Sequence, residues 1–147
     1  MPNDLLLYVF TFIFGTVVGS FLNVCIYRLP REESIAFPPS HCPTCGNKIR
    51  FYHNIPILGY LILGGKCADC GEGISALYPV VEILSGILLV LTVYIHGLGI
   101  ETLFYTIFVF SLLVIAFIDL EHMIIPNVIS LPGILVGLLF NALITDW

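Results

Sequence analysis

Four long apolar runs dominate the chain and predict four transmembrane helices. They cover Leu5 to Tyr27, Pro79 to Ile95, Thr102 to Ile118 and Val128 to Ile144. A helix needs about 17 to 25 mostly apolar residues to cross the hydrocarbon core of a bilayer, so the last three runs are near the short limit. The first run is not expected to be a cleaved signal peptide, because no basic residue precedes it and it is longer than the apolar part of such a peptide.

A polar stretch, residues 28–78, separates the first run from the second and is expected to form a small soluble loop. All five basic residues of the chain lie in it: Arg28, Arg31, Lys48, Arg50 and Lys66. The positive-inside rule therefore places this loop in the cytoplasm and the amino terminus outside. The same topology puts the turn "HGLGIE" outside and the segment "DLEHMIIPN" inside.

The composition agrees with a membrane protein. Of the 147 residues, 59% are hydrophobic and 10% charged, and the mean hydropathy is +1.05, whereas about 25% of the residues in a soluble domain are charged. We therefore predict an all-α polytopic membrane protein, embedded in a lipid bilayer, with about four transmembrane helices. The loop itself is nearly neutral, so the net charge of −5 indicates no particular partner. No nucleic-acid-binding surface is evident, and no internal repeat is expected.

Two C-x-x-C-G motifs, "CPTCG" and "CADCG", stand in the loop at a spacing typical of zinc ribbons. Their cysteines are Cys42, Cys45, Cys67 and Cys70. The glycine after each pair, Gly46 or Gly71, suits the tight turn that lets two sulfurs converge on one ion. A four-thiolate site has no open position, so the zinc is expected to be structural and to fold a loop too small for a sizeable core.

Alternatives to this metal site remain. Two disulfides are the main one, although they are more typical of secreted domains than of the reducing cytoplasm. His41, next to Cys42, could replace one thiolate. Cys25 lies inside the first apolar run and is expected to be a small packing residue.

Between the two motifs runs "NIPILGYLILGG", whose apolar core is too short to cross a bilayer. It could form strands that fold over the zinc, or it could rest at the membrane surface beside the helices. The first interpretation is favoured.

Several polar or small residues lie inside the apolar runs. Glu82 is expected in the first turn of the second helix, where the helix dipole favours a carboxylate, although a role in the functional site stays open. Asn23 and Asn141 are expected to form hydrogen bonds between helices. "GTVVG" (Gly15, Gly19) and "GILVG" (Gly133, Gly137) match the small-xxx-small pattern of membrane helix packing.

In "FIDLEHMIIPN", Asp119 directly follows the uncharged run that ends at Ile118. An acid at this interface could simply end a helix. However, Pro126 prevents a regular helix from continuing unbroken, so residues 119–127 should turn or re-enter the membrane and present Asp119 to a protein-lined, partly wet space. His122 should share the face of Asp119 if one helical turn persists, whereas Glu121 should point away.

Six motifs, taken in order, resemble the amino-terminal part of type IV prepilin peptidases. They are "GSFLNVCIYRLP", the paired "CPTC" and "CADC", "NIPILGYL", "GGKC", "ISALYPVVE" and "FIDLEHMIIPN". The resemblance implies an aspartyl endopeptidase of the bacterial inner membrane that removes the leader of type IV prepilins or pseudopilins at the cytoplasmic face. Many such enzymes also methylate the new amino terminus with S-adenosylmethionine. The resemblance assigns Asp119 as one of two catalytic aspartates and the four loop cysteines as zinc ligands.

Aspartyl protease chemistry requires a second carboxylate, because one group must activate water while the other, protonated, polarises the scissile carbonyl. The family carries it in a later Gly-x-Gly-Asp motif, which this chain lacks. We therefore expect this chain to be the amino-terminal part of the enzyme, without the carboxy-terminal catalytic part and inactive alone. Glu82 and Glu121 are weaker candidates for the second acid.

Two other functions stay open at this point. The chain could be a non-catalytic zinc-containing membrane module that binds pilin precursors or assembly proteins. It could also be a methyltransferase centred on the loop, although no glycine-rich cofactor loop supports that interpretation.

Overall fold

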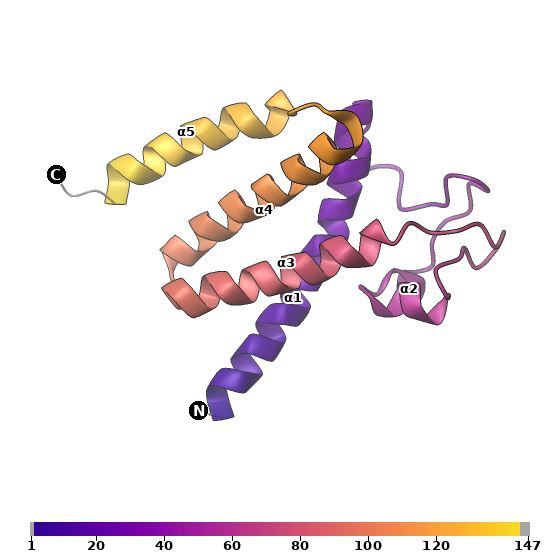
Figure 1. Cartoon of the computed structure of the whole chain (residues 1–147), viewed down its shortest axis with the longest axis horizontal. Helices are drawn as coiled ribbons and strands as arrows, with labels where there is room; N and C mark the ends of the chain where they lie inside the picture. Colours follow the sequence, from indigo (N-terminus) through magenta and orange to yellow (C-terminus); the bar gives the residue numbers. More distant parts are fainter. Residues whose placement is uncertain (1, 145–147) are drawn as a thin grey trace.

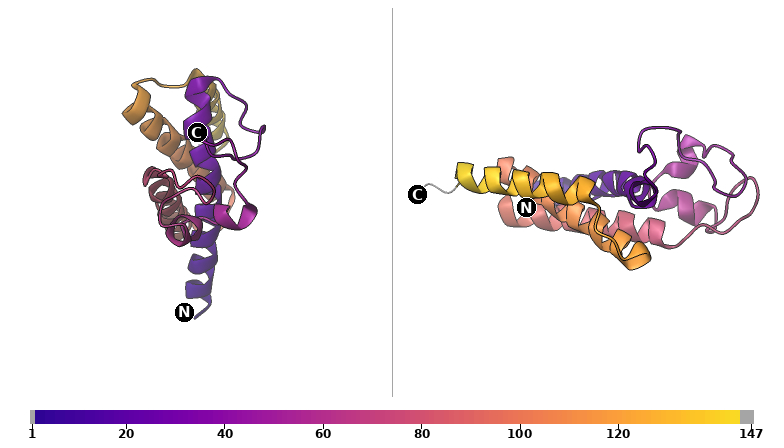
Figure 2. Two further views of the ribbon diagram at one scale, coloured as in Figure 1. Left: turned by 90° about the vertical axis from the view of Figure 1, so that its right-hand side faces the viewer. Right: turned by 90° about the horizontal axis from the view of Figure 1, so that it is seen from above.

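The computed structural model describes the backbone of residues 2–144 and the side chains of residues 5–142. Five α-helices and two short 3-10 helices follow one another: α1 (Pro2–Arg28), η1 (Leu29–Arg31), η2 (Phe51–Asn54), α2 (Leu58–Ile62), α3 (Leu77–His96), α4 (Ile100–His122) and α5 (Asn127–Ile144). The helices α3, α4 and α5 follow one another side by side, and α1 crosses them (Figure 1). The loop with α2 projects at one end of this arrangement, opposite the end of α5 (Figure 2).

The four apolar runs of the sequence are confirmed as helices. Within the described residues, three stretches are long and apolar enough to cross a membrane: Leu5–Arg31, Leu77–His96 and Ile100–His122. The predicted fourth span is also a helix, α5, but its described apolar part, Asn127–Ala142, is shorter than the three spanning helices. The chain is thus an all-α membrane protein, with three helices of clear spanning length.

The closest helix packing joins α1 to α3. A Cβ placed on Gly15 would lie 2.7 Å from Cα of Gly86, and one on Gly19 would lie 2.8 Å from Cα of Glu82. Both distances are shorter than real side chains tolerate, so only glycine lets the two backbones approach this closely. The packing role of the first small-xxx-small motif is therefore confirmed. Gly133 and Gly137 carry the same pattern on α5, but a Cβ on either would meet nothing within 4 Å among the described residues.

Polar and small residues support the same contact. The Asn23 side-chain amide donates a hydrogen bond to the Tyr78 carbonyl at 3.0 Å, which confirms the predicted bond between helices. Cys25 is buried in the apolar core beside Leu22 and Ile26, as expected. The role of Asn141 stays a prediction.

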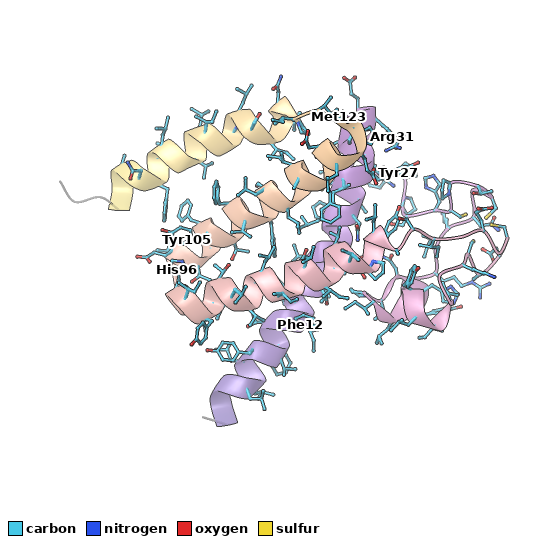
Figure 3. All side chains as sticks on the ribbon, viewed as in Figure 1. Phe12, Tyr27, Arg31, His96, Tyr105 and Met123 are labelled. Atoms are coloured by element: carbon cyan, nitrogen blue, oxygen red, sulfur yellow. The ribbon has the colours of Figure 1, made fainter. Side chains whose placement is uncertain are left out.

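A short turn joins α3 to α4 at the far end from the loop. The ring of His96 stacks on Tyr105 with centroids 4.1 Å apart (Figure 3). The Thr102 hydroxyl donates to the Gly97 carbonyl at 2.5 Å. These contacts close the turn and hold the two helices antiparallel.

The favoured interpretation of "NIPILGYLILGG" as strands is wrong. In the described part of the loop the only β-type pairings are two isolated bridges, His41 with Lys48 and Lys66 with Gly73. The segment instead forms the end of η2 and the short helix α2, which folds back so tightly that a Cβ on Gly59 would overlap the His53 carbonyl oxygen. It lies beside the membrane helices, because the N–H of Ile57 bonds to Glu82 of α3.

We predict that Gly19→Ala destabilises the α1–α3 contact. The added methyl group would overlap the α3 backbone, which should lower the free energy of unfolding by about 1–3 kcal/mol. The measurement is unfolding of the purified chain in mixed detergent micelles, followed by circular dichroism. Gly133→Ala is the matched control, and equal stability of the two variants would contradict this packing.

Candidate metal centre and acidic site

The two cysteine motifs form two knuckles, residues 40–49 and 65–74. In each knuckle the glycine after the second cysteine has a positive φ, +73° at Gly46 and +72° at Gly71, as the motif predicts. The N–H of Gly46 donates to the Cys42 carbonyl at 2.9 Å, and the N–H of Gly71 donates to the Cys67 carbonyl at 3.0 Å. These turns direct both sulfurs of a pair to the same side.

The knuckles are structural repeats of each other. Every backbone contact of the first recurs in the second 25 residues later, the offset from Cys42 to Cys67. The paired contacts are Cys42 N to Asn47 O and Cys67 N to Glu72 O, Ile49 N to Ser40 O and Ile74 N to Gly65 O, and the two isolated bridges. The sequence signals this repeat as C-x-x-C-G-x-x-I, contrary to the expectation that the chain has no internal repeat.

The four sulfurs of the knuckles converge on one point. Sγ atoms of Cys42, Cys45, Cys67 and Cys70 all lie within 4.8 Å of one another. The Cys42 and Cys70 sulfurs are 3.8 Å apart, close to the separation of about 3.8 Å expected for two thiolates 2.3 Å from one tetrahedral ion. All five cysteines are free thiols, so the disulfide alternative is not formed. The cluster can hold a metal ion, and His41 lies outside it, with its ring nitrogen 3.1 Å from the Pro39 carbonyl.

The electrostatics of the cluster suit a cation. Hydrogen bonds from the backbone N–H groups of Cys45 and Thr44 lower the pKa of Cys42 to about 6, so this sulfur is readily a thiolate. At Cys70 a hydrogen bond from the Glu72 backbone lowers the pKa, but desolvation and the neighbouring thiols outweigh it and raise the pKa to about 12. Four adjacent sulfurs cannot all ionise without a positive charge between them, and a bound metal ion would supply it.

Asp119 lies in the last turn of α4, and its side chain is exposed. The predicted break before Pro126 is confirmed, but the helix continues past Asp119 to His122, so the turn is shorter than the predicted 119–127. The helix ends where Met123 adopts a left-handed conformation with φ 54° and its N–H donates to the Asp119 carbonyl at 2.8 Å. The chain then turns through residues 124–126 into α5. The expectation of a protein-lined surrounding for Asp119 is not met by the described residues, since nothing among them covers this carboxylate.

Two polar neighbours of Asp119, Glu121 and His122, lie in different surroundings. His122 belongs to the same helical turn, and its Nδ1 is buried without a hydrogen-bond partner among the described residues, 3.9 Å from a carboxylate oxygen of Glu121. Glu121 lines a cleft of about 510 Å³ between the cysteine loop and the ends of α1, α3 and α4. Tyr27, Tyr78 and Glu82 line the same cleft, whereas Asp119 does not.

Glu82 connects the loop to the membrane helices. The helix α3 begins at Leu77, so Glu82 lies beyond the first turn, and the expected helix-dipole role is wrong. Its side chain is only 7% exposed, and one carboxylate oxygen accepts a hydrogen bond from the N–H of Ile57 at 2.7 Å. A buried carboxylate on α3 therefore holds the backbone of the "NIP" turn.

The turn that Glu82 holds is strained. Ile57 has φ 62° and ψ −52°, a region that a β-branched residue rarely adopts. The N–H of Leu58 donates to the Pro56 carbonyl at 2.6 Å, which makes residues 56–58 a γ-turn of the rare type with positive φ. Such a conformation costs about 1–3 kcal/mol and persists only where surrounding contacts impose it. Nothing in the local sequence indicates this contact, because it joins residues 25 positions apart, Ile57 and Glu82.

Comparison with known proteins gives two family matches. Residues 13–96 match the Bacterial Peptidase A24 N-terminal domain, and residues 106–147 match the Type IV leader peptidase family. Three similar proteins, each named prepilin leader peptidase/N-methyltransferase, come from Myxococcus xanthus (44% identical, 88% of this chain and 39% of the relative), Klebsiella pneumoniae (41%, 90% and 60%) and Neisseria gonorrhoeae (39%, 88% and 54%). The chain thus spans between 39% and 60% of the length of these relatives. No solved structure matches it.

We predict that Glu82→Leu releases the "NIP" turn, whereas Glu82→Gln does not. Leucine leaves the partly buried N–H of Ile57 without an acceptor, at a cost of about 1–3 kcal/mol, while glutamine keeps an acceptor oxygen. Hydrogen exchange of residues 55–63 in the detergent-solubilised chain should therefore accelerate about tenfold or more in the leucine variant. Glu101→Gln, at the far end of α4, is the control. Equal exchange in the leucine and glutamine variants would contradict the proposed contact.

Proposed function

Because this chain belongs to the type IV leader peptidase family, we propose that it contributes a catalytic aspartate and a zinc-bound loop to an aspartyl endopeptidase of the bacterial inner membrane. The substrates would be type IV prepilins or pseudopilins, cleaved at the cytoplasmic face. Residues 28–78 would form the zinc-binding loop, and residues 79–147 would form membrane helices that carry Asp119. The amino terminus would lie outside the cell, since the basic residues of the loop favour the cytoplasm.

One observation carries this proposal: Asp119 is exposed in the last turn of α4, at the end of the helices where the cysteine loop lies. Glu121, two residues further on, lines the same cleft as Cys42 and Cys67. A substrate that reaches the loop is therefore within reach of this end of α4. The position also agrees with the cytoplasmic side that the basic residues indicate.

In the proposed reaction Asp119 works with a second carboxylate. One of the pair, ionised, would remove a proton from water, and the other, protonated, would donate a hydrogen bond to the scissile carbonyl. Because two close carboxylates cannot both ionise easily, their pKa values separate and supply both protonation states at once. The exposed side of Asp119 leaves room for this partner and for the peptide. No Gly-x-Gly-Asp motif for the partner occurs in the chain.

The four cysteines would hold zinc as a structural ion. A closed set of four thiolates offers no position for water or substrate, so the ion would stabilise the knuckles without taking part in hydrolysis. Its binding energy would replace the apolar core that so small a loop lacks. Since Glu82 and the "NIP" turn attach the loop to α3, a folded loop would also fix the cleft beside Asp119.

The relatives' shared name includes a second activity, N-methyl transfer. For this chain we propose it as a secondary function, with S-adenosylmethionine as the methyl donor. The cleft beneath the loop supports it, because its volume of about 510 Å³ lies within the range of small-molecule sites. The cleft also lies beside the place where a new amino terminus would form.

We predict that Asp119→Asn abolishes leader cleavage in a complete peptidase that carries this segment. Loss of an acid–base group typically costs about 10²–10⁴ in rate, which a prepilin cleavage assay in proteoliposomes would measure as a loss of kcat. Glu101→Gln, in the first turn of α4 and so at the opposite end of the helix, is the control and should retain most activity. If the Asn variant cleaves normally but the chain still captures prepilin, the non-catalytic binding module is the better explanation.

We predict that each of the four loop cysteines is required for zinc binding. Cys67→Ser should lower bound zinc from about one ion per chain to a small fraction, because three thiolates bind far more weakly than four. Elemental analysis of the purified chain measures the zinc, and Cys25→Ser serves as the control. Asp119→Asn should keep its zinc, because Asp119 is not one of the four ligands. A full zinc load in Cys67→Ser would refute the metal site, and this result would not bear on the peptidase proposal.

A further inference from the structure

A buried positive charge stands at the end of α1. The Arg28 side chain is only 6% exposed, and its guanidinium donates to the carbonyls of Ser34 and Pro38, both at 2.7 Å. No carboxylate forms an ion pair with it within the part of the chain that the structure describes. A buried charge is costly unless an opposite charge or several hydrogen bonds compensate it. Arg28 therefore carries a positive charge that neutral carbonyls satisfy only in part.

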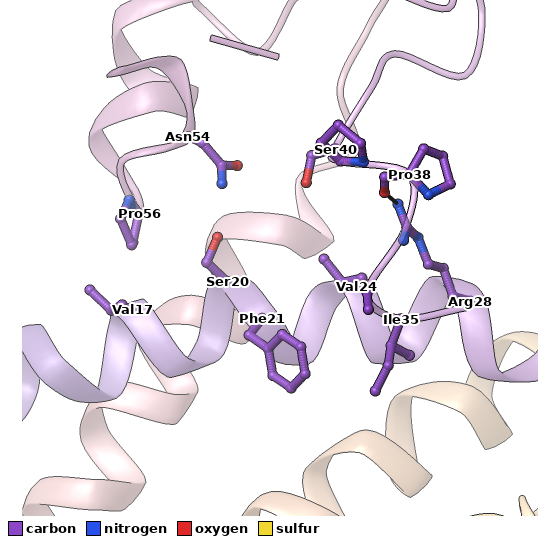
Figure 4. Close-up of a pocket in the computed structure, with 12 residues that line it drawn as sticks. Val17, Ser20, Phe21, Val24, Arg28, Ile35, Pro38, Ser40, Asn54 and Pro56 are labelled. Carbon is purple, nitrogen blue, oxygen red and sulfur yellow. Dashed lines mark hydrogen bonds between the residues drawn. The ribbon is translucent and has the colours of Figure 1, made fainter. Parts of the chain in front are cut away.

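Arg28 lies at one end of a groove of about 330 Å³ between α1 and the loop. The α1 side of the groove consists of Val17, Ser20, Phe21, Val24 and Arg28. These positions recur every three to four residues, with Ser20 and Phe21 adjacent, so they lie on one face of the helix. The distance from the first to the last is about 16 Å along its axis. Across the groove they face residues of the loop (Figure 4): Ile35, Ala36, Pro38, Pro39, Ser40, Asn54 and Pro56.

The α1 side of the groove carries a charge at one end, Arg28, and is mostly apolar over the rest of its length, with Ser20 as its one neutral polar residue. The loop side adds the polar side chains of Ser40 and Asn54. Val17 and Phe21 are about half exposed, at 52% and 49%, on a helix long and apolar enough to cross the membrane, so an acyl chain can contact them. The Ser40 hydroxyl of the loop is directed toward α1 (Figure 4). The guanidinium has five N–H donors, of which the two carbonyls use two. The remaining three can meet an anionic oxygen group, and guanidinium geometry suits phosphate in particular.

We propose that this groove binds one anionic phospholipid, with its phosphate at Arg28 and an acyl chain along Val17, Phe21 and Val24. Charge favours this occupant, because the phosphate neutralises the buried guanidinium. A zwitterionic lipid also brings an ammonium group, for which the lining residues of the groove include no carboxylate. The apolar face of α1 selects a lipid over free phosphate, which would leave that face uncovered. Basic pockets at the membrane boundary bind acidic headgroups in the same way. The bound lipid holds the loop segment 34–38 against α1, because the same guanidinium bonds to both.

Lipid titration of the detergent-purified chain in native mass spectrometry tests the site. We expect one phosphatidylglycerol to bind about tenfold more tightly than phosphatidylcholine, since the headgroup charge supplies the difference. Arg28→Gln should remove that preference, whereas Arg28→Lys should keep most of it. The matched control is Arg31→Gln: this arginine is exposed, stacks 4.0 Å over the Tyr27 ring (Figure 3) and does not line the groove.

A second variant separates binding from folding. Val24→Trp fills the groove without changing a charge, so it should weaken phosphatidylglycerol binding while circular dichroism and zinc content stay those of the parent chain. Equal affinity for the two lipids, or equal losses in Arg28→Gln and Arg31→Gln, would overturn the proposal. Displacement of the bound lipid by millimolar inorganic phosphate would also overturn it, because the groove would then be a free-phosphate site.

Discussion

The close approach of α1 to α3 is the contact on which the rest of the structure depends. It exists because Gly15 and Gly19 present no side chain to the backbone around Glu82 and Gly86. In a bilayer, where apolar side chains gain little by leaving the lipid, such backbone contacts and hydrogen bonds between helices are the main source of association. This contact brings Glu82 to the side of α1 where the loop returns, so the carboxylate can reach the N–H of Ile57.

The loop is held by two different kinds of interaction. Inside it, the paired knuckles bring four sulfurs within 4.8 Å of one another, in place of an apolar core. Outside it, the bond from Ile57 to Glu82 and the bonds from Arg28 to Ser34 and Pro38 attach it to α3 and α1. The strain at Ile57 follows from this division, because a short segment must connect two knuckles and also meet a fixed point on a membrane helix.

The exposure of Asp119 is best understood together with these attachments. The helix α4 ends at a left-handed Met123 immediately after the turn that carries the carboxylate, so the position of Asp119 is set by a rigid helix and not by a mobile loop. Functional groups on rigid elements hold their geometry more accurately than groups on loops. In the proposed peptidase, the second acid and the substrate would approach the exposed side of Asp119, while the cleft beside Glu121 would face the loop.

Much of this protein could be predicted from local sequence. Run length and hydropathy determine the helices, the C-x-x-C-G pattern determines the knuckle turns and the cysteine cluster, and Pro126 indicates a break between α4 and α5, because each depends only on neighbouring residues. Only the tertiary structure determined the features that depend on contacts between distant segments. The same glycine pattern packs in α1 but meets no neighbour in α5 among the residues that the structure describes. Glu82 accepts a hydrogen bond from Ile57 instead of stabilising its own helix end, and Arg28 is buried although it ends a helix at the edge of a polar loop. The apolar segment between the knuckles became a helix and a strained turn instead of strands, because contact with α3, and not its own sequence pattern, fixed its backbone.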